Sequence, residues 1–527
     1  SVTVLARGAV VVDATLGGDF LSAPDAWLDS KKGTALNALA ATNSILSDVD
    51  ATLKNNDIVA GGDLSVKART ASSVHASNTA NMKANTSSAG LTLAFNTVGW
   101  KSQNLLFSAV DAFAGSGIGD EDAVHAVVTI QGTQMRADGQ LSVDAETAGE
   151  ISATISNNAE STSGTAASLV LASNMVSTRA KTRIGYAWDE EVEEGGGAPT
   201  SLVAGAQNSL FGGGSLRVRS ADLASIDSKV SMESDGATTS TGGLVVRNMI
   251  NSQASSKVDQ VALASDGDIS VDALESATIS ANASGATTAA PDGFFGGKQQ
   301  GGFAANALIV INSILGGADV LVQDSNIDAG GDVRLASDNV SLIEAINNAT
   351  IKSSGTAVGV TLAFNTIGWL PTNLFYQTID ALTGSDIGDE KPAKNQVRVI
   401  GTPIFAAGDV TISAGGLATG DGEGSSSRVI ASVSNAVKAA TKHGVLDSLQ
   451  KGKGTSASFV WASNRISGET LASITPVETV DAEHPPQDLS VVTGGSLNVL
   501  AVDARVIDAN VIMSSTSAGE GAFGAVV

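Results

Sequence analysis

The chain has 527 residues, of which 54 are acidic and 30 are basic, so its formal charge is −24. A surface this negative repels nucleic-acid phosphates and anionic lipid headgroups, which excludes a nucleic-acid-binding role. The chain contains no cysteine, which excludes disulfides, thiolate metal sites and cysteine nucleophiles. No apolar run reaches the roughly 18 residues that a membrane-spanning helix needs.

Short segments with alternating apolar and polar residues recur in order along the chain. In one of them Leu64, Val66 and Ala68 share a face, a period of two that is typical of a half-buried strand rather than a helix. Similar glycine-led phrases begin at Gly62, Gly139, Gly214, Gly267, Gly331, Gly408 and Gly495. Only 4% of the residues are aromatic and 43% are hydrophobic, which predicts an all-β chain with a thin core of small and β-branched residues.

A second phrase, apolar-x-x-Asn-x-apolar, falls between the glycine phrases. Its asparagines are Asn43, Asn96, Asn174, Asn248, Asn312, Asn365 and Asn464. Where no insertion intervenes, the two phrases define a compact unit of about 53 residues, as from Gly214 to Gly267. Stacked units place like residues above like, so these asparagines are predicted to form a buried amide ladder, or alternatively to adopt left-handed turn conformations.

A longer repeat contains these units. The segment Gly90–Trp100 reads GLTLAFNTVGW, and the later segment Gly359–Trp369 reads GVTLAFNTIGW. The same offset aligns the chain without gaps from about Asn37 to Ala145. We therefore expect one continuous rod of two super-repeats with a period of roughly 270 residues. The first super-repeat is 1–301, truncated at the start, and the second is 302–527, which is incomplete.

Two folds could hold so many short strands without helical crossovers: an antiparallel sandwich array or a parallel β-solenoid. Sandwich arrays favour units of about 100 residues joined by hairpin dipeptides, which the strand phrases lack. Dividing the compact unit by three predicts coils of about 18–20 residues, the size of a three-sided parallel β-helix. Crossover chirality favours a right-handed winding, and about 20 to 25 such coils would form a rod on the order of 100 Å.

The longer gaps between phrases are predicted to be insertions at one side of the solenoid. After Trp100, the apolar residues Leu106, Val110 and Phe113 follow helical spacing, and Phe375, Ile379 and Leu382 repeat that spacing after Trp369. We expect a short helix packed over each tryptophan, and a further helix-like loop near 436–449. Trp100 and Trp369 are otherwise candidates for an exposed carbohydrate-binding surface.

Acidic residues gather in the glycine-rich loops that follow the predicted helices. Their carboxylates belong to Asp120, Glu121, Asp122, Asp386, Asp389 and Glu390. Such hard oxygen ligands suit Ca²⁺, which is the one cofactor that the sequence suggests. The alternative interpretation is a solvated polar loop with no bound metal.

The phrases GDLSVKA, GDISVDA and GDVTISA (from Gly62, Gly267 and Gly408) resemble those of filamentous-haemagglutinin-type exoproteins and giant bacterial repeat adhesins. The resemblance implies a right-handed β-helix, secretion, and a role in adhesion, biofilm or cell-surface structure. We therefore expect an extracellular bacterial protein that acts as a rigid spacer or a self-assembling filament. Expected partners are other copies, end to end or laterally, further repeats of the same chain, and cell-surface glycans.

Catalytic patterns are missing from the sequence. It contains no phosphate-binding loop, zinc spacing or nucleophile elbow, and its four histidines do not recur at equivalent repeat positions. We therefore expect no enzymatic activity. The alternative function is that of a parallel β-helix that binds or cleaves polysaccharide, which would need paired carboxylates in a groove lined with aromatic side chains.

Overall fold

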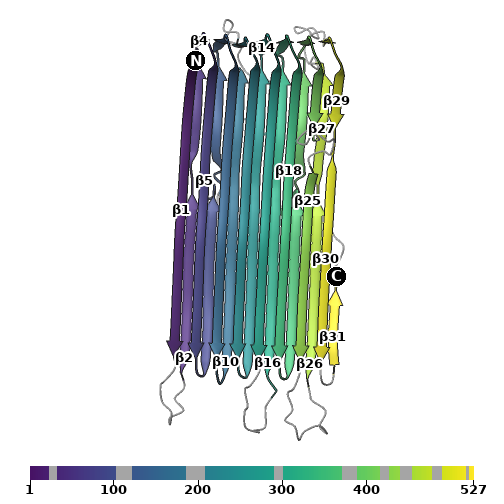
Figure 1. The fold of residues 1–527 in the computed structure, drawn as a ribbon. Helices are drawn as coiled ribbons and strands as arrows, with labels where there is room; N and C mark the ends of the chain where they lie inside the picture. Colours follow the sequence, from purple (N-terminus) through teal and green to yellow (C-terminus); the bar gives the residue numbers. More distant parts are fainter. Residues whose placement is uncertain are drawn as a thin grey trace.

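A computed structural model describes residues 1–22, 33–101, 121–185, 208–289, 301–370, 389–415, 426–439, 454–476, 490–517 and 521–527. Within these residues every regular element is a β-strand, and all strands except one short antiparallel pair stack in parallel into three sheets. The predicted all-β parallel solenoid is therefore confirmed. In Figure 1 the long strands lie side by side in sequence order, with β1 and the C-terminal strands at opposite edges.

One compact coil shows how the chain winds. It consists of β12 (Leu216–Gly236) in sheet A, β13 (Thr239–Asp259) in sheet B and β14 (Val261–Ser265) in sheet C. The chain then enters β15 (Ile269–Ala289), where Ile269 lies directly beside Leu216, so a single turn of the solenoid has been completed. The prediction of about 18–20 residues per coil is wrong, because the whole compact repeat unit forms one coil rather than three.

Sheets A and B contain the long strands. The remaining strands of sheet A are β1 (Val2–Ser22), β5 (Leu64–Ala84), β9 (Leu141–Ser161), β18 (Val333–Ser353), β24 (Val410–Ala414), β25 (Ser426–Ala439), β29 (Leu497–Ala501) and β30 (Ala504–Ser517). Those of sheet B are β2 (Thr34–Ile45), β3 (Asp48–Lys54), β6 (Ser87–Val98), β7 (Val124–Gln131), β10 (Thr165–Gly185), β16 (Phe303–Gln323), β19 (Thr356–Ile367), β22 (Ala393–Ile400), β26 (Thr455–Ile466), β27 (Gly468–Thr475) and β31 (Gly521–Val526).

Sheet C is short and closes one end of each coil. Its other strands are β4 (Asp57–Ala60), β8 (Gln134–Ala137), β11 (Asn208–Gly212), β17 (Asn326–Ala329), β23 (Ile404–Ala406) and β28 (Val491–Thr493). The longest strands of sheets A and B are about 70 Å long at ~3.3 Å per residue, whereas adjacent strands lie only ~4.8 Å apart. The solenoid is therefore a flat slab of few, very wide coils (Figure 1) rather than the expected thin rod of many narrow coils. The right-handed winding stays a prediction.

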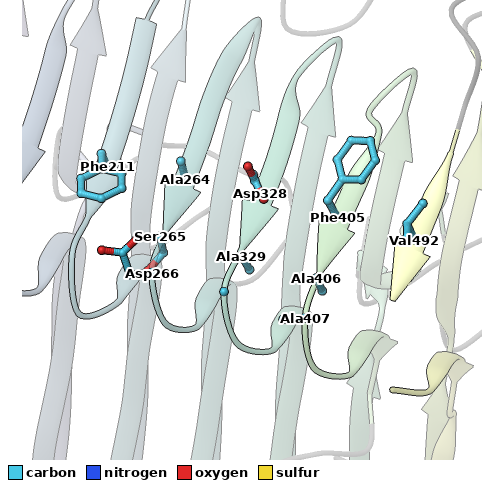
Figure 2. Close-up of a pocket in the computed structure, with 11 residues that line it drawn as sticks. Phe211, Ala264, Ser265, Asp266, Asp328, Ala329, Phe405, Ala406, Ala407 and Val492 are labelled. Atoms are coloured by element: carbon cyan, nitrogen blue, oxygen red, sulfur yellow. The ribbon is translucent and has the colours of Figure 1, made fainter. Parts of the chain in front are cut away.

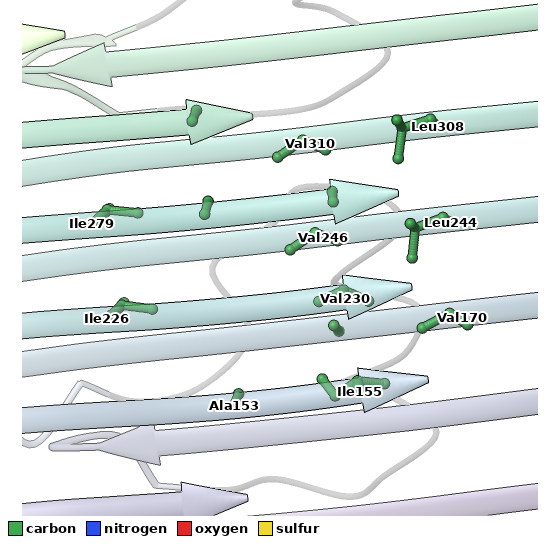
Figure 3. Packing of buried hydrophobic residues seen from close by; sticks show 14 of the residues in the cluster. Ala153, Ile155, Val170, Ile226, Val230, Leu244, Val246, Ile279, Leu308 and Val310 are labelled. Carbon is green, nitrogen blue, oxygen red and sulfur yellow. The ribbon is translucent and has the colours of Figure 1, made fainter. Parts of the chain in front are cut away.

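The core lies between sheets A and B and is built from columns of similar side chains. Ile226 and Ile279 occupy equivalent places on neighbouring strands of sheet A, and Leu244 and Leu308 do so in sheet B (Figure 3). All four are at most 1% exposed. Because each coil covers the apolar side chains of the previous one, coils can be added without enlarging the core, and small residues such as Ala153 fill the thin space between the sheets.

Two equivalent excursions leave sheet B at Gly99 and Gly368. Both glycines have positive φ, 78° and 75°, and a Cβ at either would lie 2.1 Å from a carbonyl oxygen. Trp100 then pairs in antiparallel fashion with Glu121, and β20 (Trp369–Leu370) pairs in the same way with β21 (Asp389–Glu390). The predicted helices at 106–113 and 375–382 lie outside the described residues. Of the helix predicted near 436–449, residues 436–439 belong to strand β25, and the rest also lies outside.

Candidate functional site

Sheet B contains a continuous ladder of asparagine side chains along its inner face. Each Nδ2 donates a hydrogen bond of 2.8 Å to the Oδ1 of the next asparagine toward the C-terminus. The ladder joins Asn43, Asn96, Asn174, Asn248, Asn312, Asn365 and Asn464 in that order. Its five central members are at most 1% exposed. A primary amide offers both a donor and an acceptor, so identical side chains satisfy one another when they stack in register.

The ladder asparagines lie within strands, so the alternative interpretation as left-handed turn residues is wrong. Among the described residues, the only ones other than glycine with positive φ are Asn55, Gln260 and Asp324. Asn174 Nδ2 also reaches Ser228 Oγ at 3.1 Å and thereby links sheet B to sheet A. The ladder is thus a polar spine within the apolar core that fixes the register of seven successive strands.

A second polar row crosses the middle of the slab and separates two large apolar clusters. We call it the central seam. In sheet A it consists of Thr70, Thr147, Asp222, Glu275 and Asn339, each beside the next in the ladder of paired strands. Thr178 and Ser252 face it from sheet B. The excursions that leave sheet B at Gly99 and Gly368 lie at the level of the seam. After the first excursion the chain rejoins sheet B at Val124, which pairs with Thr178.

Asp222 and Glu275 lie side by side in the seam with 0% exposure. Asp222 accepts hydrogen bonds from Thr178 Oγ1 at 2.6 Å and from the Gln253 backbone N–H at 3.0 Å. Glu275 Oε1 accepts one from Ser252 Oγ at 2.5 Å, while its Oε2 has no partner. Gly316 leaves room for this carboxyl, because a Cβ there would lie 2.8 Å from Oε1.

Burial raises the pKa of both carboxyl groups toward or above neutrality. Loss of hydration raises the pKa of Asp222 to about 7, although the hydrogen bonds from Thr178 and Gln253 oppose the change. Loss of hydration, reinforced by the charge of Asp222, raises the pKa of Glu275 to about 8, against the bond from Ser252. The pair is a protonation site buried inside the slab.

The two tryptophans differ in their surroundings. Trp100 is 6% exposed and packs with Met175, Met249 and Leu315. Trp369 is half-buried, and the guanidinium of Arg465 lies 5.3 Å from its ring centre, a cation–π contact. Trp100 therefore offers no open face for a sugar ring, and one face of Trp369 is already covered.

The acidic loop residues engage protein donors where the structure describes them. Glu121 Oε1 accepts hydrogen bonds from Ser177, Arg179 and Asn251 at 2.5, 2.9 and 2.7 Å. Asp122 pairs with Lys101 at 3.0 Å.

The equivalent residues of the second excursion are only partly described. Glu390 accepts a hydrogen bond from Ser467, whereas Asp120, Asp386 and the side chain of Asp389 lie outside the described residues. The residues that the structure does describe hold no cluster of three or more metal-ligating side chains. Calcium binding at these loops stays a prediction.

The outer face of sheet A carries charge pairs between successive coils. Lys67 lies 3.5 Å from Asp144 and Arg69 2.5 Å from Glu146, each on the strand next to its partner. Exposed pairs of this kind contribute only about 0–1 kcal/mol each. They oppose a shift of register, because sliding one strand by two residues to place Lys67 beside Glu146 would leave Arg69 opposite Ala148, without an acidic partner there.

A trough of about 470 Å³ lies along the outer face of sheet C (Figure 2). Phe211 and Val492 stand near its ends, with Ala264, Asp328 and Phe405 on the strands between them. Arg136 stacks on Phe211 at 4.6 Å from the ring centre, and Phe405 is 40% exposed. Sequence patterns missed this trough because its residues come from strands of different coils, far apart in the chain.

The described part of the chain contains no helix long and apolar enough to cross a membrane. Comparisons with protein-family models, with curated proteins and with solved structures found no match to this chain.

Proposed function

We propose that this chain is a structural repeat segment of an extracellular bacterial surface or filament-forming protein, acting as a rigid spacer or as the building block of a fibre. The observation that carries the proposal is the unbroken register of the coils, marked by one hydrogen-bonded asparagine per coil from Asn43 to Asn464. Such an interior maintains alignment along the stacking axis, which a spacer or a fibre needs.

Two further features support this proposal. Backbone hydrogen bonds of the sheets run along the stacking axis, so each coil is held to the next over two strands of about 70 Å. The formal charge of −24 keeps a large, β-rich surface soluble and opposes lateral aggregation. The resemblance to secreted repeat adhesins suggests the bacterial surface as its location.

Electron microscopy tests this proposal in two ways. Purified chains should appear as uniform slabs or as fibres built from them. Gold-labelled antibodies against the chain should mark the outside of intact source cells before any permeabilisation. Label that appears only after the cells are opened would contradict an extracellular role, whatever the shape of the purified particles.

The trough on sheet C favours glycan binding as a second candidate function. Two aromatic side chains with aspartates between them can stack on sugar rings and accept their hydroxyl hydrogens. We expect binding to a panel of bacterial polysaccharides, measured by calorimetry, to weaken at least tenfold in Phe405→Ala. Leu471→Ala is the control, because Leu471 is similarly exposed, at 38%, but lies on sheet B. Equal binding by both variants would reject the trough.

A further inference from the structure

The trough on sheet C contains one residue at the same level from each of five successive coils (Figure 2). These residues are paired directly from strand to strand and form a row along the stacking axis: Phe211, Ala264, Asp328, Phe405 and Val492. At ~4.8 Å per strand the row is about 19 Å long, and its two phenylalanines lie about 14 Å apart. The trough is therefore elongated along the stacking axis and longer than a single sugar ring.

The lining of the trough carries negative charge. It includes the carboxyl groups of Asp266 and Asp328, both on exposed residues, whereas the described residues that line it include no lysine, arginine or histidine. The cation next along the row is Arg136, which stacks on Phe211 beyond the end of the trough and lies 3.8 Å from Asp138. The two carboxylates inside the trough are thus open to a positively charged ligand.

A row of aspartates adjoins the trough at the corner between sheets C and A. Asp268 Oδ1 accepts a hydrogen bond from the Asp332 backbone N–H at 2.8 Å, and Asp332 Oδ1 accepts one from that of Asp409 at 2.7 Å. Asp409 Oδ1 accepts one from the Ser496 backbone N–H at 2.7 Å. The three exposed aspartates follow one another at strand spacing. In a chain with a formal charge of −24 they add to the negative potential that attracts cations.

The strands beneath the trough offer no edge to an added peptide strand. Strands β11, β14, β17 and β23 are each paired on both sides. A peptide bound by strand addition needs an edge with free backbone groups. The trough offers instead the rings of Phe211 and Phe405, the latter 40% exposed, and such rings can stack on the apolar faces of sugars.

We infer that the trough binds a linear glycan that carries free amino groups and lies along the stacking axis. Its sugar rings stack on Phe211 and Phe405, and its ammonium groups pair with Asp266 and Asp328. The inference rests on the second candidate function, glycan binding at the trough, and names its ligand class. Polyanionic glycans are disfavoured, because the charges of the trough and of the whole chain repel them.

Calorimetry with two matched series of sugars tests the amino groups. Glucosamine oligomers carry an ammonium group on every sugar, whereas N-acetylglucosamine oligomers of the same length carry none. The glucosamine series should bind at least tenfold more tightly at low salt. Salt at about 1 M, where the Debye length is about 3 Å, should remove most of the difference. Affinity should rise with length until an oligomer spans the row of about 19 Å, and equal affinity of monomer and long oligomers would overturn the linear binding mode.

Three variants separate charge from stacking. Asp328→Asn keeps the shape of the trough but removes a carboxylate, so it should weaken binding of glucosamine oligomers severalfold and leave the acetylated series unchanged. Phe405→Ala should weaken both series. Glu344→Gln removes one charge from the exposed face of β18 and should change neither. Equal losses in Asp328→Asn and Glu344→Gln would show that only the overall charge attracts the ligand, which would overturn the inference.

Further outcomes separate this inference from the functions on which it rests. Polylysine that binds as tightly as the glucosamine series, and that weakens equally in Phe405→Ala, would show a general cation site and refute the inference. Equal affinity for the two sugar series would refute the amino-group requirement alone and keep glycan binding. Binding of neither series, nor of any polysaccharide in the panel, would refute the second candidate function. None of these results changes the shape expected for the purified particles, which tests the structural role.

Discussion

Glu275→Gln is expected to raise the free energy of unfolding at pH 8 by roughly 2–4 kcal/mol, an unusual gain for a change to a fully buried side chain. Burial raises the pKa of Glu275 from 4.5 to about 8 because its ionised form loses hydration beside Asp222. At pH 8 the wild-type fold must hold this carboxyl partly ionised or bind a proton from dilute solution. A glutamine keeps the shape and carries no charge.

The sign of the pH dependence follows from the same shift. Between pH 4.5 and pH 8 the folded chain keeps a proton on Glu275 that the unfolded chain has lost, so stability falls as pH rises through this range. Asp222, with its pKa raised to about 7, adds to the fall in the same direction. With respect to these two groups we therefore expect the wild-type chain to be most stable below about pH 4, where both carboxyls are protonated in the folded and in the unfolded chain.

Urea unfolding at pH 5 and at pH 8 measures the effect. The gain in Glu275→Gln should be large at pH 8 and small at pH 5. Glu344→Gln, the same substitution on the exposed face of β18, should change stability by no more than about 0.5 kcal/mol at either pH. The comparison of variants also removes the contribution of the overall charge of −24. A gain that is equal at both pH values would show that the carboxyl does not titrate as described.

Asn248→Ala should cost about 3–5 kcal/mol, because each buried polar atom left unsatisfied costs about 1–3 kcal/mol. The substitution removes two ladder bonds of 2.8 Å, leaves Asn174 Nδ2 without this acceptor and Asn312 Oδ1 without a donor, and opens a small cavity. Asn43→Ala, at the partly exposed end of the ladder, removes a single bond and should cost about 1 kcal/mol.

Hydrogen exchange with mass spectrometry locates the damage. In Asn248→Ala the loss of protection should centre on β10, β13 and β16, because coils of a solenoid interact mainly with their neighbours. Loss spread evenly over the slab, or equal losses in the two variants, would mean that the ladder does not stabilise the coils locally.

The fold class could be predicted because two signals agreed. Alternation such as that of Leu64, Val66 and Ala68 indicated strands, and the constant spacing of the phrases indicated a solenoid. The ladder followed from the seven asparagines. The predicted coil length was wrong, although the spacing of the same asparagines indicates the correct one. Asn43 and Asn96 can form a direct hydrogen bond only if the whole stretch of chain between them makes a single coil.

The central seam could not be predicted from the repeat pattern. Asp222 and Glu275 fall on inward positions that neighbouring strands fill with Thr70, Thr147 and Asn339, so no repeated acidic position marked them. Their proximity depends on β12 and β15 being neighbouring strands, whereas coils a third as long would have placed the two residues three coils apart. The trough on sheet C was missed for the same reason, since Phe211 and Phe405 come together only after the coils close.

The central claim is that each compact repeat unit forms one wide coil with parallel neighbours, and a cross-link between Ser225 and Thr278 tests it most directly. These two outer-face residues are strand neighbours in β12 and β15, so the double cysteine variant should form an intramolecular disulfide within one chain, detectable by mass spectrometry. Ser225→Cys with Gly243→Cys, the pair that a coil a third as long would bring together, should stay reduced. Formation of the second disulfide without the first would contradict the architecture.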